Sequence, residues 1–178
     1  MSLKDQILNI LEISRTAELE FISSLTDDER VYEGTFEKWS VKDAIAHANY
    51  WQDVRAVRTE AWIAGDDLET LPQYEQANFD SYQRFAKLTW KEIETFAQQT
   101  HEKIRKTIQG LSEDALSGPS DVSDDRQLWE VLVGSFFTHK LMHYTEFYHA
   151  RGQRDVVSRI WGEWADLVSP LDDRANWQ

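Results

Sequence analysis

Apolar residues recur at helical spacing along most of the chain. In residues 3–24 they stand mostly three or four positions apart, which places them along one side of a helix. The apolar positions of this segment are Ile7, Leu8, Leu11, Ile13, Leu19 and Ile22. The pattern predicts a helix from Ser2 to about residue 24.

Two further long segments show helical periodicity, and both contain histidine. One begins at Ser40 and ends near Gly65, and the other runs from Leu128 to a stop at Gly152. Glycine is favoured just beyond the last turn of a helix because it adopts positive φ without strain. The apolar face of the first segment holds Val41, Ala44, Ile45, Ala48, Trp51 and Val54. We predict one long helix in each segment.

The remaining segments complete the predicted order of elements. A third long helix starts at Phe79 or Thr89 and runs to Ile108, with Gly110 as its stop, and a shorter helix covers residues 156–168. Residues 26–36, 66–77 and 117–127 are expected to be connections. Four helix starts carry a serine or threonine followed three residues later by an acid, the spacing of a capping box: Ser2 and Asp5, Thr26 and Glu29, Ser40 and Asp43, Thr89 and Glu92.

These elements predict an all-α protein. The chain has only 7 glycines and 3 prolines in 178 residues, which disfavours a turn-rich β fold. Four long amphipathic helices bury their apolar faces best as a four-helix bundle, with the short C-terminal helix packed outside it. The length suits one domain that spans residues 1–178.

Charge and composition narrow the classes of partner. A formal net charge of -13 repels phosphate backbones and anionic membrane surfaces, so we expect neither nucleic acid nor membrane as a partner, and cationic or neutral ligands fit better. The chain starts without the apolar core of a secretory signal, and we expect a cytoplasmic protein. It contains no cysteine, so a bound metal needs nitrogen and oxygen ligands and any thiol must come from a cosubstrate.

Three histidines lie on the two histidine-bearing helices. His139 and His143 differ by four positions, or about 40° around a helix axis, so both can point at one site. His47 lies on the apolar face of the helix that begins at Ser40. Three imidazoles can hold a zinc, nickel or iron ion and leave one position open, as catalytic sites do. We therefore predict His47, His139 and His143 as metal ligands.

Other residues allow alternative interpretations. Glu146 follows His139 by seven positions, so it can orient a ligand or move protons as a catalytic residue, or it can be an exposed acid paired with Arg151 or a lysine. Each of the three histidines can also be a hydrogen-bonded core residue. His101, in a charged stretch, is expected on a solvated face. His149 should lie at the surface or between helices.

The order of motifs resembles that of a known superfamily. The segments WSVKDAIAHANYW, IQGLSEDAL and LWEVLVGSFFTHKLMHYTEF are similar to those of the DinB-like superfamily, and closest to its ClbS/DfsB-type branch, over residues 3–152. The resemblance implies a DinB-like four-helix bundle with an additional C-terminal helix. It also implies a divalent ion, nickel or zinc, on His47, His139 and His143, and a homodimer. The segment HARGQ is similar to another subgroup that would use His149. In that alignment Thr145 takes the position four residues earlier and is a poor ligand.

The resemblance implies a metal-dependent enzyme that acts on a small electrophilic molecule in detoxification or self-protection. The reaction would be a hydrolysis or a transfer to a low-molecular-weight thiol. One alternative is a protein of the same fold that binds or sequesters a small molecule without catalysis. Another is a structural dimer whose histidines belong to the core.

Overall fold

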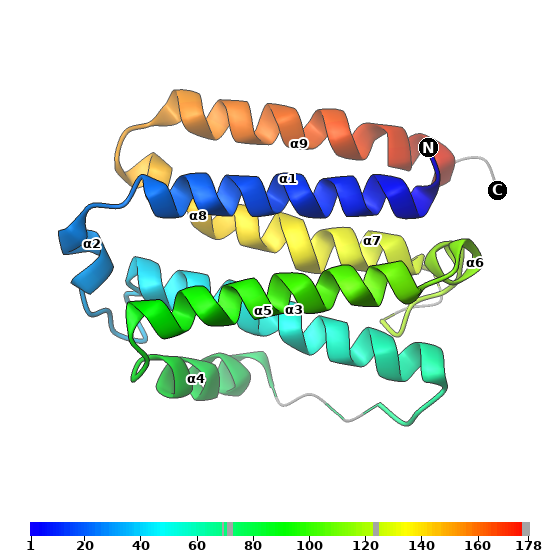
Figure 1. Cartoon of the computed structure of the whole chain (residues 1–178), viewed down its shortest axis with the longest axis horizontal. Coiled ribbons are helices and arrows are strands. Elements are labelled where there is room, and N and C mark those ends of the chain that lie inside the picture. The colour runs from blue at the N-terminus through cyan, green and yellow to red at the C-terminus, as the bar shows by residue number, and fades with distance from the viewer. Residues whose placement is uncertain (69, 71–72, 123–124, 176–178) are drawn as a thin grey trace.

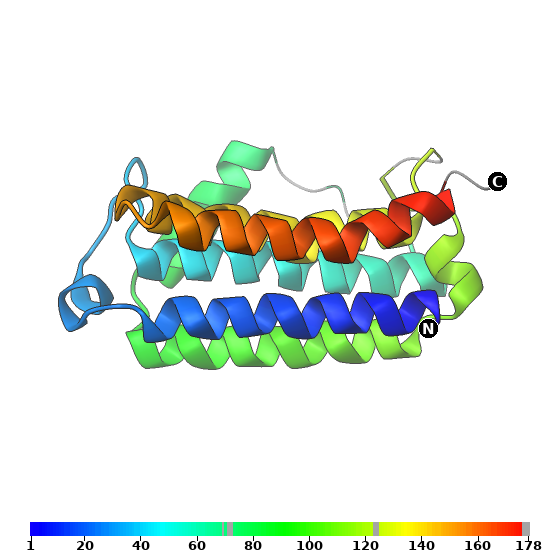
Figure 2. The same cartoon turned by 90° about the horizontal axis from the view of Figure 1, so that it is seen from above.

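The computed structural model describes residues 1–68, 70, 73–122 and 125–175. Its main body is a bundle of four long helical segments that lie along one common axis (Figures 1 and 2). The segments are α1 (Leu3–Ser23), α3 (Val41–Ala64), α5 (Trp90–Gly110) and a continuous run of α7 (Leu128–Val133), η1 (Gly134–Thr138) and α8 (His139–Ala150). The predicted all-α bundle is confirmed. No helix among the described residues has the length and hydropathy needed to span a bilayer.

The bundle helices form a closed ring of neighbours. Helix α1 contacts α5 and α8, and α3 contacts the same two helices from the opposite side. The predicted capping boxes form at Ser2, Thr26, Ser40 and Thr89, and each satisfies backbone N–H groups that a helix start leaves unpaired. Gly65 ends α3 with a φ of 74°, as predicted. The termini of the long helices are therefore set by local sequence.

The region before α5 differs from the prediction. Residues 74–85 form a separate helix, α4 (Tyr74–Phe85), and the long helix starts after Thr89, the second of the two predicted starts. The break is stabilised by Lys42, whose Nζ donates to the carbonyls of Ala86 and Leu88 at 3.0 and 2.9 Å. Two short helices, α2 (Asp27–Val31) and α6 (Glu113–Ser117), lie in the connections. Gly110 is the last helical residue of α5 rather than its stop.

The C-terminal helix is longer than the sequence predicted. Helix α9 spans Arg154–Ala175 and packs outside the bundle against α1 and α8 (Figure 1). The sequence predicted a helix over residues 156–168, which would end before Pro170, a residue without a backbone N–H. Instead, α9 continues past Pro170, and buried Leu171 joins Ile160 and Trp164 in the core. Residues 169–175 are therefore helical as well, and residues 176–178 lie outside the described part of the chain.

Candidate metal centre

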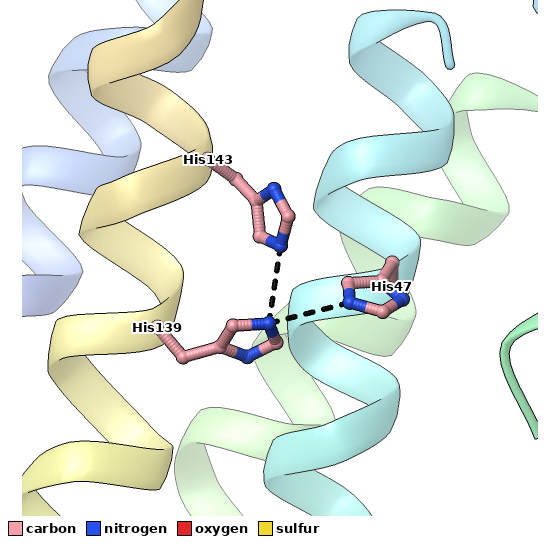
Figure 3. Close-up of side chains that lie close together, drawn as sticks. All are labelled: His47, His139 and His143. Atoms are coloured by element: carbon pink, nitrogen blue, oxygen red, sulfur yellow. Dashed lines mark hydrogen bonds between the residues drawn. The ribbon is translucent and has the colours of Figure 1, made fainter. Parts of the chain in front are cut away.

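The three predicted histidines converge between α3 and α8 (Figure 3). His47 points from α3 toward α8, and His139 and His143 point back from successive turns of α8. The Nε2 atom of His139 lies 3.3 Å from Nε2 of His47 and 3.1 Å from Nε2 of His143. All three ligand atoms lie within 4.8 Å of one another. Residues 92 positions apart in the chain thus form one cluster.

The spacing of these nitrogens fits a shared metal ion. Two nitrogens bound to one zinc ion at about 2.0–2.1 Å and at a tetrahedral angle lie about 3.3 Å apart. The two short Nε2 separations, 3.1 and 3.3 Å, match this value. The donor set has three neutral nitrogens and no thiolate, which suits zinc, nickel or iron.

Hydrogen bonding alone does not satisfy the cluster. A neutral imidazole nitrogen either donates one hydrogen or accepts at one lone pair. The Nε2 of His139 has two imidazole neighbours at hydrogen-bond distance, so it can make a regular bond to only one of them. A cation that binds the three lone pairs removes this conflict. The residues present therefore fit a divalent ion.

Burial keeps the imidazoles neutral, which is the form that binds metal. His47 is only 6% exposed, and His139 and His143 are half-buried. Desolvation, together with the neighbouring imidazoles His143 and His139, lowers the pKa of His47 to about 3. Desolvation and His143 lower the pKa of His139 to about 4, and desolvation also lowers the pKa of His143. Protons therefore compete weakly with a metal ion at neutral pH.

Two tryptophans flank the cluster. The ring of Trp39 lies 4.3 Å from that of His47 and 5.8 Å from that of His143, measured between centroids. Trp51, one turn after His47, meets it edge-on at 6.5 Å. These rings shield His47 from solvent and limit its rotation.

A π turn immediately precedes His139. In η1 the backbone N–H of His139 donates to the carbonyl of Gly134, five residues earlier. A π turn adds one residue to the helix, so the side chains after it are rotated by about 100° relative to those before it. The Gln52 side chain of α3 donates to the carbonyl of Phe136 inside this turn. The rotation that directs His139 toward His47 thus depends on a π turn, which the apolar pattern did not predict.

A buried charge network lies beside the cluster. Glu18 of α1 is fully buried, and the pattern analysis missed it because it is a charged residue on the apolar side of α1. Its Oε1 accepts from Asn49 at 3.0 Å and from the Tyr144 hydroxyl at 2.6 Å. Its Oε2 accepts from Lys140 at 2.9 Å and from Arg15. Although burial alone raises the pKa of Glu18, Lys140, Arg15 and Tyr144 lower it to about 2.

The network joins the helices that carry the histidines. Asn49 follows His47 by two residues on α3, and Lys140 directly follows His139 on α8. One carboxylate on α1 therefore binds both helices next to their candidate metal ligands. This arrangement sets the distance and rotation between α3 and α8.

Pockets reach the triad from two sides. One, of about 290 Å³, is lined by His143, Glu146, Trp39 and Phe147 among others. In it the Glu146 carboxylate lies 3.7 Å from Nδ1 of His143, and its side chain is 70% exposed. The other pocket, of about 410 Å³, reaches His139. Small molecules can therefore approach the cluster.

Asp43, His149 and His101 do not belong to the triad. Asp43 accepts hydrogen bonds from the backbone and side chain of Ser40, so the capping role explains it. His149 is exposed, as expected. The prediction for His101 was wrong, because it is 8% exposed and lies 3.7 Å from Glu12 between α1 and α5.

Comparison with known proteins agrees with this architecture. The model of the DinB superfamily matches residues 10–147, which include all three histidines. The chain belongs to the DinB superfamily. No curated protein and no solved structure matches it. The superfamily includes metal-binding proteins, and the DinB-like triad described above is a possible metal site of this kind.

Proposed function

We propose that this DinB-like protein is a divalent-metal-dependent enzyme that acts on a small electrophilic molecule. The observation that carries the proposal is the convergence of three neutral imidazoles, with pockets on two sides. The Nε2 of His139 lies 3.3 Å from that of His47 and 3.1 Å from that of His143, as expected for nitrogens that share one ion. A purely structural cluster would not need access for small molecules.

Each group has a defined task in the proposed reaction. His47, His139 and His143 would hold the ion, nickel or zinc. When bound, the ion would supply Lewis acidity, which lowers the pKa of a water or thiol and so favours the nucleophilic form near neutral pH. Trp39 excludes water from one side of His47. Glu146, in the pocket with His143, accepts or returns a proton. Since the chain has no cysteine, a thiol nucleophile would come from a low-molecular-weight cosubstrate.

The class of electrophile follows from the resemblance of the two histidine motifs to the ClbS/DfsB-type branch. We include strained rings, such as epoxides and activated cyclopropanes, because ring opening by a nucleophile needs no further cofactor. Hydrolysis and thiol transfer share this first attack and differ only in the nucleophile.

Metal-loaded protein tests the proposal directly. Protein prepared with nickel, zinc, iron or manganese is incubated with an epoxide or an activated cyclopropane, with and without glutathione, and products are followed by mass spectrometry. We expect turnover that requires metal and is lost in His139→Ala. Saturable binding without product under every combination would instead support a non-catalytic binding protein.

A further inference from the structure

The pocket that reaches His139 has a distinctive lining. It lies between α3, the start of α4, the connection before α7 and the π turn, and we call it the arginine pocket. Its lining includes Arg55, Arg58, Arg126, Trp51, Tyr74 and His139. Its volume, about 410 Å³, falls within the range of small-molecule sites.

The charge of this pocket opposes that of the whole protein. The chain carries a net charge of -13, yet three guanidinium groups line the pocket together with a single carboxylate, that of Glu130, among the described residues. When the buried carboxylate of Asp121, which pairs with Arg55 and Arg58, is also counted, the pocket keeps one net positive charge. The total charge, from which we expected a cationic or neutral ligand, therefore does not describe the charge of this pocket. An acidic protein that gathers arginines around a cavity makes a site for an anion.

The arginines are held in place for this role. Asp121 has a fully buried side chain that accepts from Arg55 at 2.6 Å and from Arg58 at 3.2 Å. Within the described part of the chain, Arg55 uses one of its donors in this way. The backbone carbonyl of Arg126 accepts from the Ser120 N–H at 3.0 Å, whereas its guanidinium has no hydrogen bond or ion pair to the described residues. A guanidinium has five donors in a planar fork that matches a carboxylate. Donors on Arg55 and Arg126 thus remain available to a ligand.

Another part of the lining is aromatic. Trp51 and Tyr74 stack with centroids 4.6 Å apart and an interplanar angle of 16°. The Trp51 indole N–H donates to Asn78 at 2.9 Å, which fixes the ring. Trp51 is 8% exposed and Tyr74 is 68% exposed, so Tyr74 supplies most of the flat apolar surface that this stacked pair leaves open to solvent. Such a surface favours a planar apolar group in the ligand.

We propose that the arginine pocket binds a small organic carboxylate with a planar apolar portion, held by Arg55 and Arg126 and directed at the metal-binding face of His139. The inference that this carboxylate is a substrate rests on the proposed function, since it names the substrate class of the same site. The inference that the pocket binds the carboxylate rests on the lining of the pocket alone.

Phenylacetate and phenylacetamide are matched probes, because they have nearly the same shape and only the first is charged. Their affinities are measured at low salt from the shift of the Trp51 indole N–H signal in NMR spectra, assigned with Trp51→Phe. Measurements use metal-free and zinc-loaded protein. Arg126→Gln tests the pocket without breaking an ion pair, and Arg105→Gln, on α5, is the control. Arg55→Gln is a second variant whose folding is checked by its melting temperature.

We expect saturable binding of phenylacetate, about tenfold weaker binding of phenylacetamide, and about tenfold loss for phenylacetate in Arg126→Gln and in folded Arg55→Gln. Arg105→Gln should bind like the wild type. Equal affinities for the two probes, or wild-type affinity in both pocket variants, would overturn the inference. Because metal-free protein is included, carboxylate selectivity is measured even if no turnover is found. Turnover without carboxylate selectivity would leave the proposed function standing alone.

Discussion

The Lys140 ammonium donates to the Glu18 carboxylate at 2.9 Å inside the bundle, although 122 residues separate the two in the chain. Both side chains are almost fully buried, with exposures of 3% and 0%. Burying two charges is costly, and here the cost is offset by mutual attraction and by the hydrogen bonds to Tyr144, Asn49 and Arg15. The pair ties α1 to α8 directly beside His139.

Removing one member of this pair should destabilise the protein strongly. Glu18→Ala leaves the Lys140 charge buried without an acid, and we expect a loss of about 3–5 kcal/mol in the free energy of unfolding. The double variant Glu18→Leu, Lys140→Met should lose less, because no unpaired charge remains. Urea unfolding measures both. Glu163→Gln breaks the exposed pair with Arg159 and should cost less than about 1 kcal/mol.

Acid should reduce the contribution of Glu18 to the free energy of unfolding over a defined range of pH. Its pKa is about 2 in the folded protein and 4.5 as the ordinary value, so ionised Glu18 favours folding. This contribution, about 3 kcal/mol, is fully present above about pH 4.5 and is lost as the pH falls toward 2. The stability difference between wild type and Glu18→Gln should therefore shrink over this range in urea unfolding. A stability difference between the two proteins that stays constant from pH 6 to 2.5 would contradict this pH dependence.

Metal binding should depend on the triad and not on the other histidine of α8. His139→Ala removes the central Nε2 of the cluster, and we expect at least about 100-fold weaker zinc or nickel binding in equilibrium dialysis. His149→Ala, on the exposed surface of the same helix, should retain wild-type affinity. Equal affinities in the two variants would argue against the predicted ligands.

Glu146 should affect the rate of the proposed reaction and not the binding of the metal ion. If its carboxylate moves a proton, Glu146→Gln lowers kcat by about 10²–10⁴-fold and removes one limb of the pH profile of kcat, while metal content stays unchanged. Glu102→Gln, an acid on α5, is the control. Loss of metal from Glu146→Gln would assign Glu146 to the support of His143, from whose Nδ1 it lies 3.7 Å away.

The π turn should matter for the register of α8. Gln52→Met removes the donor to the carbonyl of Phe136 and leaves that buried acceptor without it. We expect about tenfold weaker metal binding in a protein that remains helical by circular dichroism. Gln76→Met serves as the control, because the Gln76 amide donates to the exposed side chain of Asp80. Unchanged affinity in Gln52→Met would show that the turn holds its shape without this bond.

Much of the fold was predictable because it depends on local sequence. Each capping box involves residues three positions apart, and the starts of α1, α3 and α5 follow from Ser2, Ser40 and Thr89. The histidine pair on α8 is likewise set by helical spacing. The inward direction of His47 followed from its apolar neighbours, since the face that buries Ala44 and Trp51 also carries it.

The rest required contacts between distant segments. Leu19 was expected on the apolar face of α1 but is 49% exposed, whereas Glu18 is buried, because the partners of Glu18 come from α3 and α8. His101 is buried because α1 covers its side of α5. The total charge did not indicate the arginine-lined cavity, since charge along a chain does not show that Arg55, Arg58 and Arg126 line one cavity.

The sequence by itself determined the helices, their caps and the three imidazoles that face inward, because hydrophobic period and capping act over only a few residues. Only the tertiary structure decided that these imidazoles meet at 3.1 and 3.3 Å, that a π turn precedes His139 and that arginines surround the adjoining pocket. These features depend on the packing of α3 against α8, which is determined by burial and charge pairing between residues far apart in the chain.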